Sequence, residues 1–346
     1  MTEKLIVLNS IHLKQIHAEN TITQYFQLKN CNITNGNFSN SQISEVNLER
    51  CNLSGINFSG AVLTDVNLAN SDLENSNFKH AILINVNLTG ANLSHSNLNN
   101  VYIYNSILTK SNLTDTHVKE SSFIQSRLNH INAQYADFSH SDLSSLDMRY
   151  SNFLGSTFNT INLSNSNLYG ANLSYVNISK SNLNGASLQV ANVSSSSLDN
   201  STFNHVIAIG VRFNRSELSS ITFNNANLTE ARFEEAELSD ISFTQSNLKL
   251  ANFDWSRTSK LNFEKSDLTK ASFKRAKLKA SQFKSTINKW TIFTMSDLRD
   301  ADFSKANIHK MDVSGANLDN VNFTATKNRN SVIGLARASN IKTIIN

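Results

Sequence analysis

A large apolar residue occurs at every fifth position of the chain, from Leu28 to Phe323. This column has 60 positions without an insertion or deletion, and its only smaller or polar members are Ala133, Ala208, Thr258 and Asn288. Two residues earlier lies a second column of small or β-branched residues, usually with Asn or Asp between the two columns. A period of five fits neither an α-helix nor a flat β-strand, so the pattern predicts a repeat protein.

Within each five-residue unit, the small residue and the large residue are two positions apart and point to the same side of a short extended segment. We call them the first and third places, and we expect the second, fourth and fifth places to face outward. Eight of the 10 glycines and many asparagines occupy the fifth place, which indicates a corner that tolerates positive φ. Because Tyr150, Val190 and Trp255 also occupy it, we expect that positive φ is not required at every corner.

These units resemble the A(D/N)LXX consensus of the pentapeptide-repeat family. Three of them match it directly: Ala91-Asn92-Leu93, Ala171-Asn172-Leu173 and Ala301-Asp302-Phe303. The resemblance implies an all-β fold, a right-handed quadrilateral parallel β-helix in which four units form one coil of 20 residues. The 60 units would then form about 15–16 coils.

A coil of 20 residues predicts that phenylalanines 20 apart stack on one another. The sequence contains two such ladders: Phe203, Phe223, Phe243, Phe263, Phe283, Phe303 and Phe323, and Phe213, Phe233, Phe253, Phe273 and Phe293. We expect residues 1–27 to form an N-terminal cap or an irregular first coil. Residues 28–325 are expected to form the uninterrupted β-helix, and residues 326–346 a C-terminal cap or dimerisation tail.

Composition excludes several classes of protein. The 346 residues include no proline and only 2 cysteines, which argues against a disulfide-stapled secreted scaffold. No apolar run approaches the roughly 18 residues of a membrane span, and the N-terminus lacks the features of a signal peptide. We expect a bacterial cytoplasmic location, with non-classical secretion into a host cell as the alternative.

The two cysteines, Cys31 and Cys51, are 20 residues apart and both occupy the first place, so they should stack in neighbouring coils. One interpretation is a redox pair. The interpretation that we favour is two small core residues, equivalent to Ser71 and Ala91, which continue the same column.

Nothing in the sequence indicates catalysis. All nine histidines occupy outward places, and there is no glycine-rich phosphate loop, nucleophile elbow or metal-ligand pair with the required spacing. We therefore predict a protein that is not an enzyme and that has no catalytic residue, cofactor site or metal site.

Most outward positions are Ser, Asn or Thr, so apolar exceptions are informative. The clearest exception spans three consecutive coils on one face, in the units AILIN (81–85), VYIYN (101–105) and SSFIQ (121–125). Five residues should form a contiguous apolar surface there: Ile82, Ile84, Tyr102, Tyr104 and Ile124. We call this surface the apolar patch and interpret it as a candidate protein-binding site. Packing among exposed neighbours is the alternative.

Smaller groups are better explained by local packing. The first is Arg149, Tyr150 and Tyr169, in which Arg149 could stack on Tyr169. Two more are apolar: Val190 with Ile207 and Ile209, and Trp290 with Ile292 and Met295. At Thr258 and Asn288, which interrupt the core columns, a local bulge and a buried hydrogen bond are both open.

Charge is distributed unevenly along the chain. Residues 1–250 have a net charge of −5 and residues 251–346 a net charge of +9. Ten basic residues fall on all four predicted faces and form what we call the basic collar: Arg257, Lys260, Lys265, Lys270, Lys274, Arg275, Lys277, Lys279, Lys284 and Lys289. The collar could contact a polyanion, in which case affinity should fall steeply with salt; ordinary solubilisation is the alternative.

The resemblance leaves three hypotheses for function. The leading one is a rigid, non-catalytic scaffold or adaptor for an unidentified protein partner, with a homodimer through the C-terminal end as a further expectation. The second is a bacterial effector that acts as an adaptor inside a host cell. The third is a DNA mimic that regulates or protects DNA gyrase, as some family members do. The basic C-terminal third disfavours this mimicry, because a mimic of DNA needs a dense anionic surface.

Overall fold

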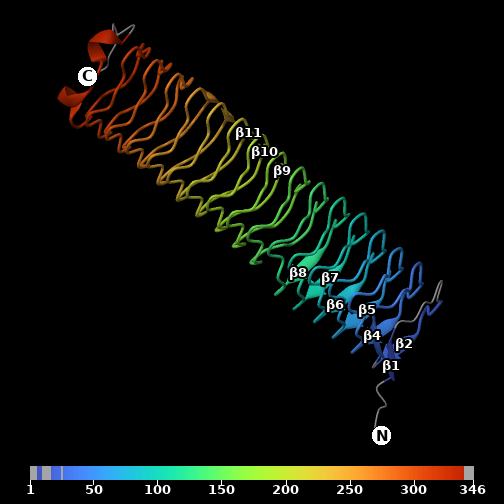
Figure 1. Ribbon diagram of the computed structural model, residues 1–346. Coiled ribbons are helices and arrows are strands. Elements are labelled where there is room, and N and C mark those ends of the chain that lie inside the picture. The colour runs from blue at the N-terminus through green and yellow to red at the C-terminus, as the bar shows by residue number, and fades with distance from the viewer. Residues whose placement is uncertain (1–5, 10–16, 25, 339–346) are drawn as a thin grey trace. The chain divides into compact units, whose positions relative to one another are not determined.

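The computed structural model describes residues 6–9, 17–24 and 26–338 of the chain. Its contacts divide the chain into two compact units, Met1–Asn172 (unit 1) and Leu173–Asn346 (unit 2). In each unit, short parallel strands and single β-bridges join residues that are 20 positions apart (Figure 1). Each unit is therefore an all-β parallel solenoid, which confirms the predicted fold class.

The regular strands are short and belong to three parallel sheets. The first sheet pairs β1 with β3, the second has the order β2-β4-β5-β6-β7-β8, and the third has the order β13-β12-β11-β10-β9. Their bounds are β1 Ile6–Asn9, β2 Ile22–Gln24, β3 Phe26–Lys29, β4 Gln42–Ser44, β5 Val62–Thr64, β6 Ile82–Ile84, β7 Tyr102–Tyr104, β8 Ser122–Ile124, β9 Asn177–Ser179, β10 Ser197–Asp199, β11 Glu217–Ser219, β12 Glu237–Ser239 and β13 Arg257–Ser259. Two short 3₁₀ helices follow, η1 Arg329–Ser331 and η2 Leu335–Arg337.

Each coil has four faces of five residues, which we name from the residue numbers. Face A holds the numbers 1–5 above a multiple of 20, face B 6–10, face C 11–15 and face D 16–20. Strands β4–β8 thus lie on face A of unit 1 and strands β9–β13 on face D of unit 2. Elsewhere a single bridge at the second place joins successive coils, as between Asn92 and Asn112.

The third-place residues fill the interior, and in unit 2 they form the two predicted phenylalanine ladders. Rings of one ladder stack nearly parallel, as between Phe233 and Phe253 at 4.6 Å. Rings of opposite ladders meet edge to face, as between Phe243 and Phe253 at 5.8 Å. Both arrangements are favourable for aromatic rings, so the repeat of Phe every 20 residues packs the core along the whole ladder.

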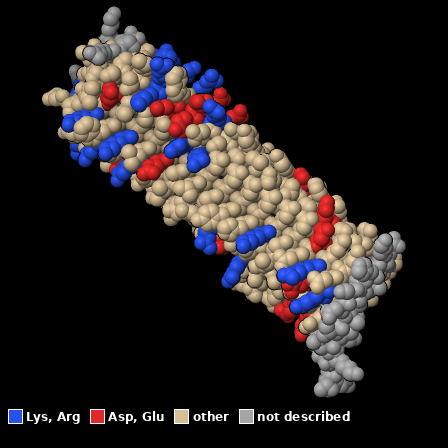
Figure 2. Space-filling model, in the orientation of Figure 1, with Lys and Arg blue, Asp and Glu red and all other residues tan. Residues whose placement is uncertain are grey.

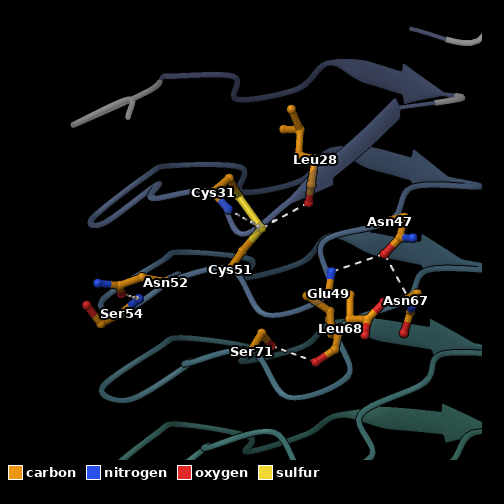
Figure 3. Close-up of a disulfide and its surroundings, with 10 residues drawn as sticks. All are labelled: Leu28, Cys31, Asn47, Glu49, Cys51, Asn52, Ser54, Asn67, Leu68 and Ser71. Carbon is orange, nitrogen blue, oxygen red and sulfur yellow. Dashed lines mark hydrogen bonds between the residues drawn. A yellow bond between two sulfur atoms is a disulfide. The ribbon is translucent and has the colours of Figure 1, made fainter. Parts of the chain in front are cut away.

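The second-place asparagines connect the coils through their side chains. Asn47 Oδ1 accepts hydrogen bonds from the Glu49 backbone N–H at 3.0 Å and from Asn67 Nδ2 at 3.1 Å (Figure 3). The first bond fixes the turn in its own unit, and the second links the next coil. The same two bonds recur along other second-place columns. They explain why Asn or Asp precedes the large residue, a role that the periodicity alone did not reveal.

First-place serines satisfy backbone groups at the coil corners. Ser71 Oγ donates to the Leu68 carbonyl oxygen at 2.7 Å (Figure 3), whereas Ser96 Oγ donates to the Leu73 carbonyl oxygen at 2.9 Å. Ser96 Oγ also lies 3.1 Å from the Ser76 backbone nitrogen, from which it accepts a hydrogen bond. A buried hydroxyl with these partners is stable in the interior, so polar serine and apolar alanine can share one inward column.

The corners show that one sequence expectation was wrong. Every fifth-place residue from Asn30 to Ala325 has positive φ, including Tyr150 at 57°, Val190 at 51° and Trp255 at 63°. The turn geometry therefore overrides residue preference even for a β-branched side chain, although the left-handed region costs a non-glycine residue about 1–2 kcal/mol. A single geometry at each corner keeps the register constant.

Glycine at some corners makes room for the side chain of the preceding coil. A Cβ atom at Gly155 would lie 2.7 Å from the ring of Tyr135, and one at Gly170 would lie 2.9 Å from the ring of Tyr150. The corner side chain thus lies over the equivalent corner 20 residues later. Where a large side chain occupies a corner, glycine at the equivalent corner of the next coil leaves space for it. The two residues at such positions are therefore coupled by packing.

The two polar interruptions of the third-place column are accommodated by hydrogen bonds. Asn288 is fully buried, and its Nδ2 donates to Thr286 Oγ1 at 2.5 Å, while Thr258 Oγ1 donates to the Lys277 carbonyl oxygen. The 20-residue register continues through both positions, since the Asn288 N–H donates to the Asn307 carbonyl oxygen and Thr258 pairs with Leu238. Of the two explanations left open, hydrogen bonding is the one that the structure shows.

The end segments partly keep the coil spacing. Strand β1 pairs with β3 at a separation of 20 residues, and Lys327 still bridges Asn307 at that separation. The spacing changes at Ile333, which bridges Asp312, next to η1 and η2. Assignment of residues 1–27 and 326–346 as caps, or of the latter as a dimerisation tail, stays a prediction. Residues 1–5, 10–16, 25 and 339–346 of these segments lie outside the described residues.

Replacing Val190 by Asn should stabilise unit 2 by about 1 kcal/mol, because Asn tolerates positive φ better than a β-branched residue. Val190 is half exposed, so little buried contact is lost. Chemical denaturation of the two proteins measures the difference. The reverse change at an equivalent corner, Asn225→Val, serves as the control and should be destabilising. Equal midpoints for all three proteins would contradict this account of the corners.

Replacing Asn288 by Leu should raise the unfolding free energy by about 1–3 kcal/mol, the usual cost of a buried unsatisfied polar group. The reason is that Asn288 Oδ1 is buried and has no hydrogen-bond partner among the described residues. Thr286 Oγ1 keeps its bond to the Phe283 carbonyl oxygen. Thermal and urea unfolding provide the measurement, and Asn288→Asp, which buries a charge, should act in the opposite direction. A lower stability for the Leu variant would refute the prediction.

Candidate protein-binding site

The apolar patch lies on face A of unit 1, on three adjacent parallel strands. Ile82 in β6 pairs with Tyr102 in β7, and these two residues stand in the second place of their units. Ile84 pairs with Tyr104, and Tyr104 with Ile124 in β8, in the fourth place. Figure 1 shows β6, β7 and β8 next to one another. The register thus brings the five predicted residues together as two neighbouring columns.

All five side chains of the patch are accessible to solvent. Ile82, Tyr102 and Ile124 are 38%, 40% and 38% exposed, and Ile84 and Tyr104 are partly exposed. Between the two columns, the third-place residues Leu83, Ile103 and Phe123 point inward and are buried, so the patch lies directly over the core. Its backbone positions are held by hydrogen bonds to the coils on both sides.

The structure extends this surface by a residue that the sequence analysis did not include. Val62 in β5 pairs with Ile82 and is partly exposed in the same column. The 20-residue spacing alone could have identified it. Strands β4–β8 contain no Lys, Arg, Asp or Glu, and the carboxylates of this face in the same coils, Glu45 and Asp65, lie at the corners.

The group of Arg149, Tyr150 and Tyr169 is arranged differently from the expectation. Arg149 forms a two-pronged ion pair with Asp147, with Nε and Nη2 each 2.8 Å from a carboxylate oxygen. Tyr150 stacks on His130 at 5.2 Å and meets Tyr169 edge to face at 5.5 Å. The expected stacking of Arg149 on Tyr169 is therefore replaced by contacts between aromatic rings.

The other two apolar groups also make local contacts. Val190 lies over the corner at Gly210, and Ile207 is exposed on the neighbouring coil. In the third group, Trp290 has Lys310 Nζ 4.2 Å above its ring centroid and His309 at its edge. A cation above the ring is a favourable contact on an exposed surface.

All ten residues of the basic collar are exposed, and charged residues of both signs mix on the visible face of the C-terminal coils (Figure 2). Four collar residues form ion pairs with carboxylates: Arg257 with Glu237, Lys260 with Asp240, Lys265 with Glu264 and Lys279 with Asp300. Arg275 lies 4.5 Å over the ring of Trp255. In the described part of the chain, six collar residues have no carboxylate partner: Arg275, Lys270, Lys274, Lys277, Lys284 and Lys289. They are distributed over all four faces, so polyanion binding stays a prediction.

Two ion pairs of the same form occur where Asp in the second place precedes Arg in the fourth place. Hydrogen bonds from Arg149 lower the pKa of Asp147, and those from Arg299 lower the pKa of Asp297.

The carboxyl group of Asp137 is affected by opposing influences. Burial raises its pKa, but hydrogen bonds from Ser139 and Lys119 outweigh burial, so the net pKa is lowered. A lowered carboxyl pKa stabilises the fold above the unfolded pKa, and this stability is lost as pH falls through the folded pKa. These hydrogen bonds therefore contribute to the stability of the fold at neutral pH.

Among the described residues, no group of three or more His, Cys, Asp or Glu side chains could hold a metal ion. No helix in that part of the chain is long and apolar enough to cross a membrane. The open groove described below lies on face D of unit 2 and is lined mostly by polar and charged side chains.

The repeat itself matches a known family model. The model for pentapeptide repeats matches in 8 copies, over residues 41–79, 81–119, 121–159, 151–189, 209–245, 246–284 and 289–327. This is well over half of the chain. The chain belongs to the pentapeptide-repeat family. A comparison with curated protein sequences gives no significant match.

Several solved structures resemble this pentapeptide-repeat protein. One is HetL, a pentapeptide-repeat protein involved in the regulation of heterocyst differentiation from the cyanobacterium Nostoc sp. strain PCC 7120. It has 21% identity and a TM-score of 0.42 over 62% of this chain and 88% of HetL. Another is QnrB1, a plasmid-mediated fluoroquinolone resistance protein, with 20% identity and a TM-score of 0.31 over 50% of this chain and 93% of QnrB1. These values are too low to transfer a function.

The cysteines of this pentapeptide-repeat protein correct another expectation. Cys31 and Cys51 were expected to be two unbonded core residues, but the structure joins them in a disulfide with their Cα atoms 4.5 Å apart (Figure 3). Both are buried. Cys51 Sγ lies 3.0 Å from the Leu28 carbonyl oxygen and 3.1 Å from the Cys31 backbone nitrogen. The hydroxyl of a first-place serine makes the equivalent two contacts elsewhere, as Ser96 Oγ does with the Leu73 carbonyl oxygen and the Ser76 backbone nitrogen.

The double variant Cys31→Ser/Cys51→Ser should keep the fold but lose about 3 kcal/mol of stability relative to the oxidised protein. The estimate is the loop-closure effect of a cross-link of this span, and serine suits the vacated first places. Urea unfolding of unit 1 with and without reductant measures the loss. The reduced wild-type protein should behave like the double variant. Identical unfolding of the oxidised and reduced wild-type proteins would contradict the cross-link.

Proposed function

We propose that this pentapeptide-repeat protein is a non-catalytic scaffold that binds a protein partner through the apolar patch of unit 1. The observation that carries the proposal is the alignment of Ile82, Tyr102 and their three neighbours on adjacent strands of an otherwise polar repeat surface. Exposed aromatic and aliphatic side chains that touch one another are typical of binding hot spots.

The chemistry of the patch indicates its partner. With no charged residue in β4–β8, the strands of the patch offer no charge of their own to an ionic ligand. Two tyrosine hydroxyls can form hydrogen bonds at the edge of a contact whose centre is apolar. The partner that fits is a protein that presents aliphatic or aromatic side chains on an uncharged surface.

The parallel ladder supports binding because it holds the patch in place. Each strand of the patch is hydrogen-bonded to the coils before and after it, and its inward neighbours are packed in the core. A surface that is ordered before binding loses less conformational entropy on association. This favours a scaffold whose recognition surface is preformed.

Charge argues against imitation of DNA. A mimic needs a continuous anionic surface, whereas the C-terminal coils carry the basic collar and both signs of charge appear side by side (Figure 2). We therefore do not extend the proposal to gyrase, and no observation singles out delivery into a host cell.

Replacing Tyr102 and Tyr104 by Ser should abolish partner binding and leave the fold intact, because both side chains point outward and Ser already occupies position 122 in the same column. Parallel affinity captures with the wild-type and double-variant proteins identify proteins retained by the wild type alone. Each retained protein is then purified and tested for direct binding, with an expected loss in affinity of more than about tenfold.

Tyr135→Ser is the matched control, because Tyr135 is 59% exposed at a corner away from the patch. It should leave binding unchanged. A photo-cross-linking residue at position 102 should label the partner, whereas one at position 135 should not. If the purified partner binds the double variant as tightly as it binds the wild type, the patch is not the site.

A further inference from the structure

Face D of unit 2 carries its charges in blocks. The second-place column there reads Glu217, Glu237, Arg257 and Lys277 in four successive coils. Two acidic residues are thus followed by two basic ones along the direction in which the coils stack. All four side chains are exposed. In the next coil of the column, Asp297 bridges Lys277 in the ladder, but its carboxylate is bound by Arg299.

This order is unfavourable for the chain by itself. Glu217 pairs directly with Glu237 in the ladder, and Arg257 bridges Lys277, and like charges opposite one another on neighbouring strands are destabilising. An alternation of signs would avoid both repulsions. Among these four residues, the ion pair that the structure describes is between Glu237 and Arg257 at 3.2 Å.

Glu217 and Lys277, at the two ends of this block of four residues, have no ion-pair partner on this face among the described residues. Within the residues that the structure describes, the ion pairs of this face are Glu237–Arg257, Asp240–Lys260, Lys279–Asp300 and Arg299–Asp297. None of them involves Glu217 or Lys277. Beside the column, the serines Ser219, Ser239 and Ser259 line an open groove of about 650 Å³, so no bulky neighbour shields the charges.

We propose that a second copy of this chain docks on face D of unit 2 in the antiparallel direction. A two-fold axis parallel to the strands, between β12 and β13, would place Glu217 of each copy opposite Lys277 of the other and Glu237 opposite Arg257. The same surface would then serve both copies, as a two-fold interface requires. Glu217 and Lys277 would pair between the copies, and both like-charge contacts would gain opposite charges across the interface.

A second copy fits this face better than a polyanion does. Lys277 and Arg257 would attract nucleic acid or an acidic protein, but Glu217 and Glu237 would repel it. A second solenoid has the same spacing of about 4.8 Å between coils, so all four pairs stay in register. The contact covers few coils and is mainly ionic, so the association should be weak and sensitive to salt.

The test uses sedimentation equilibrium of the full chain at about 0.05 M and 0.5 M salt. The wild type should self-associate at low salt and less at high salt. Glu217→Lys and Lys277→Glu each put like charges at both ends of the column, so each variant alone should lose more than about tenfold in association constant. An equimolar mixture of the two variants restores every pair between unlike chains and should associate again.

Two controls carry the same change of net charge away from this face: Glu230→Lys and Lys284→Glu. Both should self-associate like the wild type, and circular dichroism should show the same fold for all variants. A wild type that stays monomeric at low salt, a dimer that persists in both single variants, or a mixture that associates no better than its components would overturn the proposal. These outcomes do not depend on Tyr102 or Tyr104, so they are distinct from a failure of the protein-binding patch.

Discussion

Backbone hydrogen bonds between adjacent coils organise every other feature of this protein. Each of these N–H groups donates to the carbonyl oxygen of a residue 19 or 21 positions away, as from Ile33 to Asn52 and from Asn52 to Cys31. Residues 20 positions apart are therefore paired, and each side chain has stacked neighbours from the same place of the repeat. A favourable neighbour is therefore favourable along a whole column, as with the phenylalanine ladders and the Asn side chains that bridge successive coils. An unfavourable neighbour, such as Glu217 beside Glu237, is equally forced by the register.

The fold could be predicted from the sequence because its main determinant is periodic. The column from Leu28 to Phe323 specifies which side chains point inward, and the ladders of Phe residues specify the 20-residue coil. The same register correctly placed Ile82, Tyr102 and the other patch residues side by side. Burial and strand pairing follow directly from a period that has no interruption.

What the sequence did not reveal depends on local geometry. Val190 and Trp255 adopt positive φ because the turn requires it, against their own preference. Arg149 binds Asp147, two residues away in the same repeat unit, where the guanidinium makes two charge-assisted hydrogen bonds to the carboxylate. The disulfide between Cys31 and Cys51 needs a Cα separation that a first-place column provides, but the spacing alone could not distinguish bonded sulfurs from small core residues.

The constant register also limits how such a chain can change in length. Loss or gain of a single residue would turn every later inward side chain outward, and a change of five residues would keep inside and outside but move each later side chain to the adjacent face. Only a change of 20 residues preserves both the inward or outward orientation of each later side chain and the face on which it lies. A continuous surface such as the one around Tyr102 can therefore be lengthened only by duplication of a whole coil.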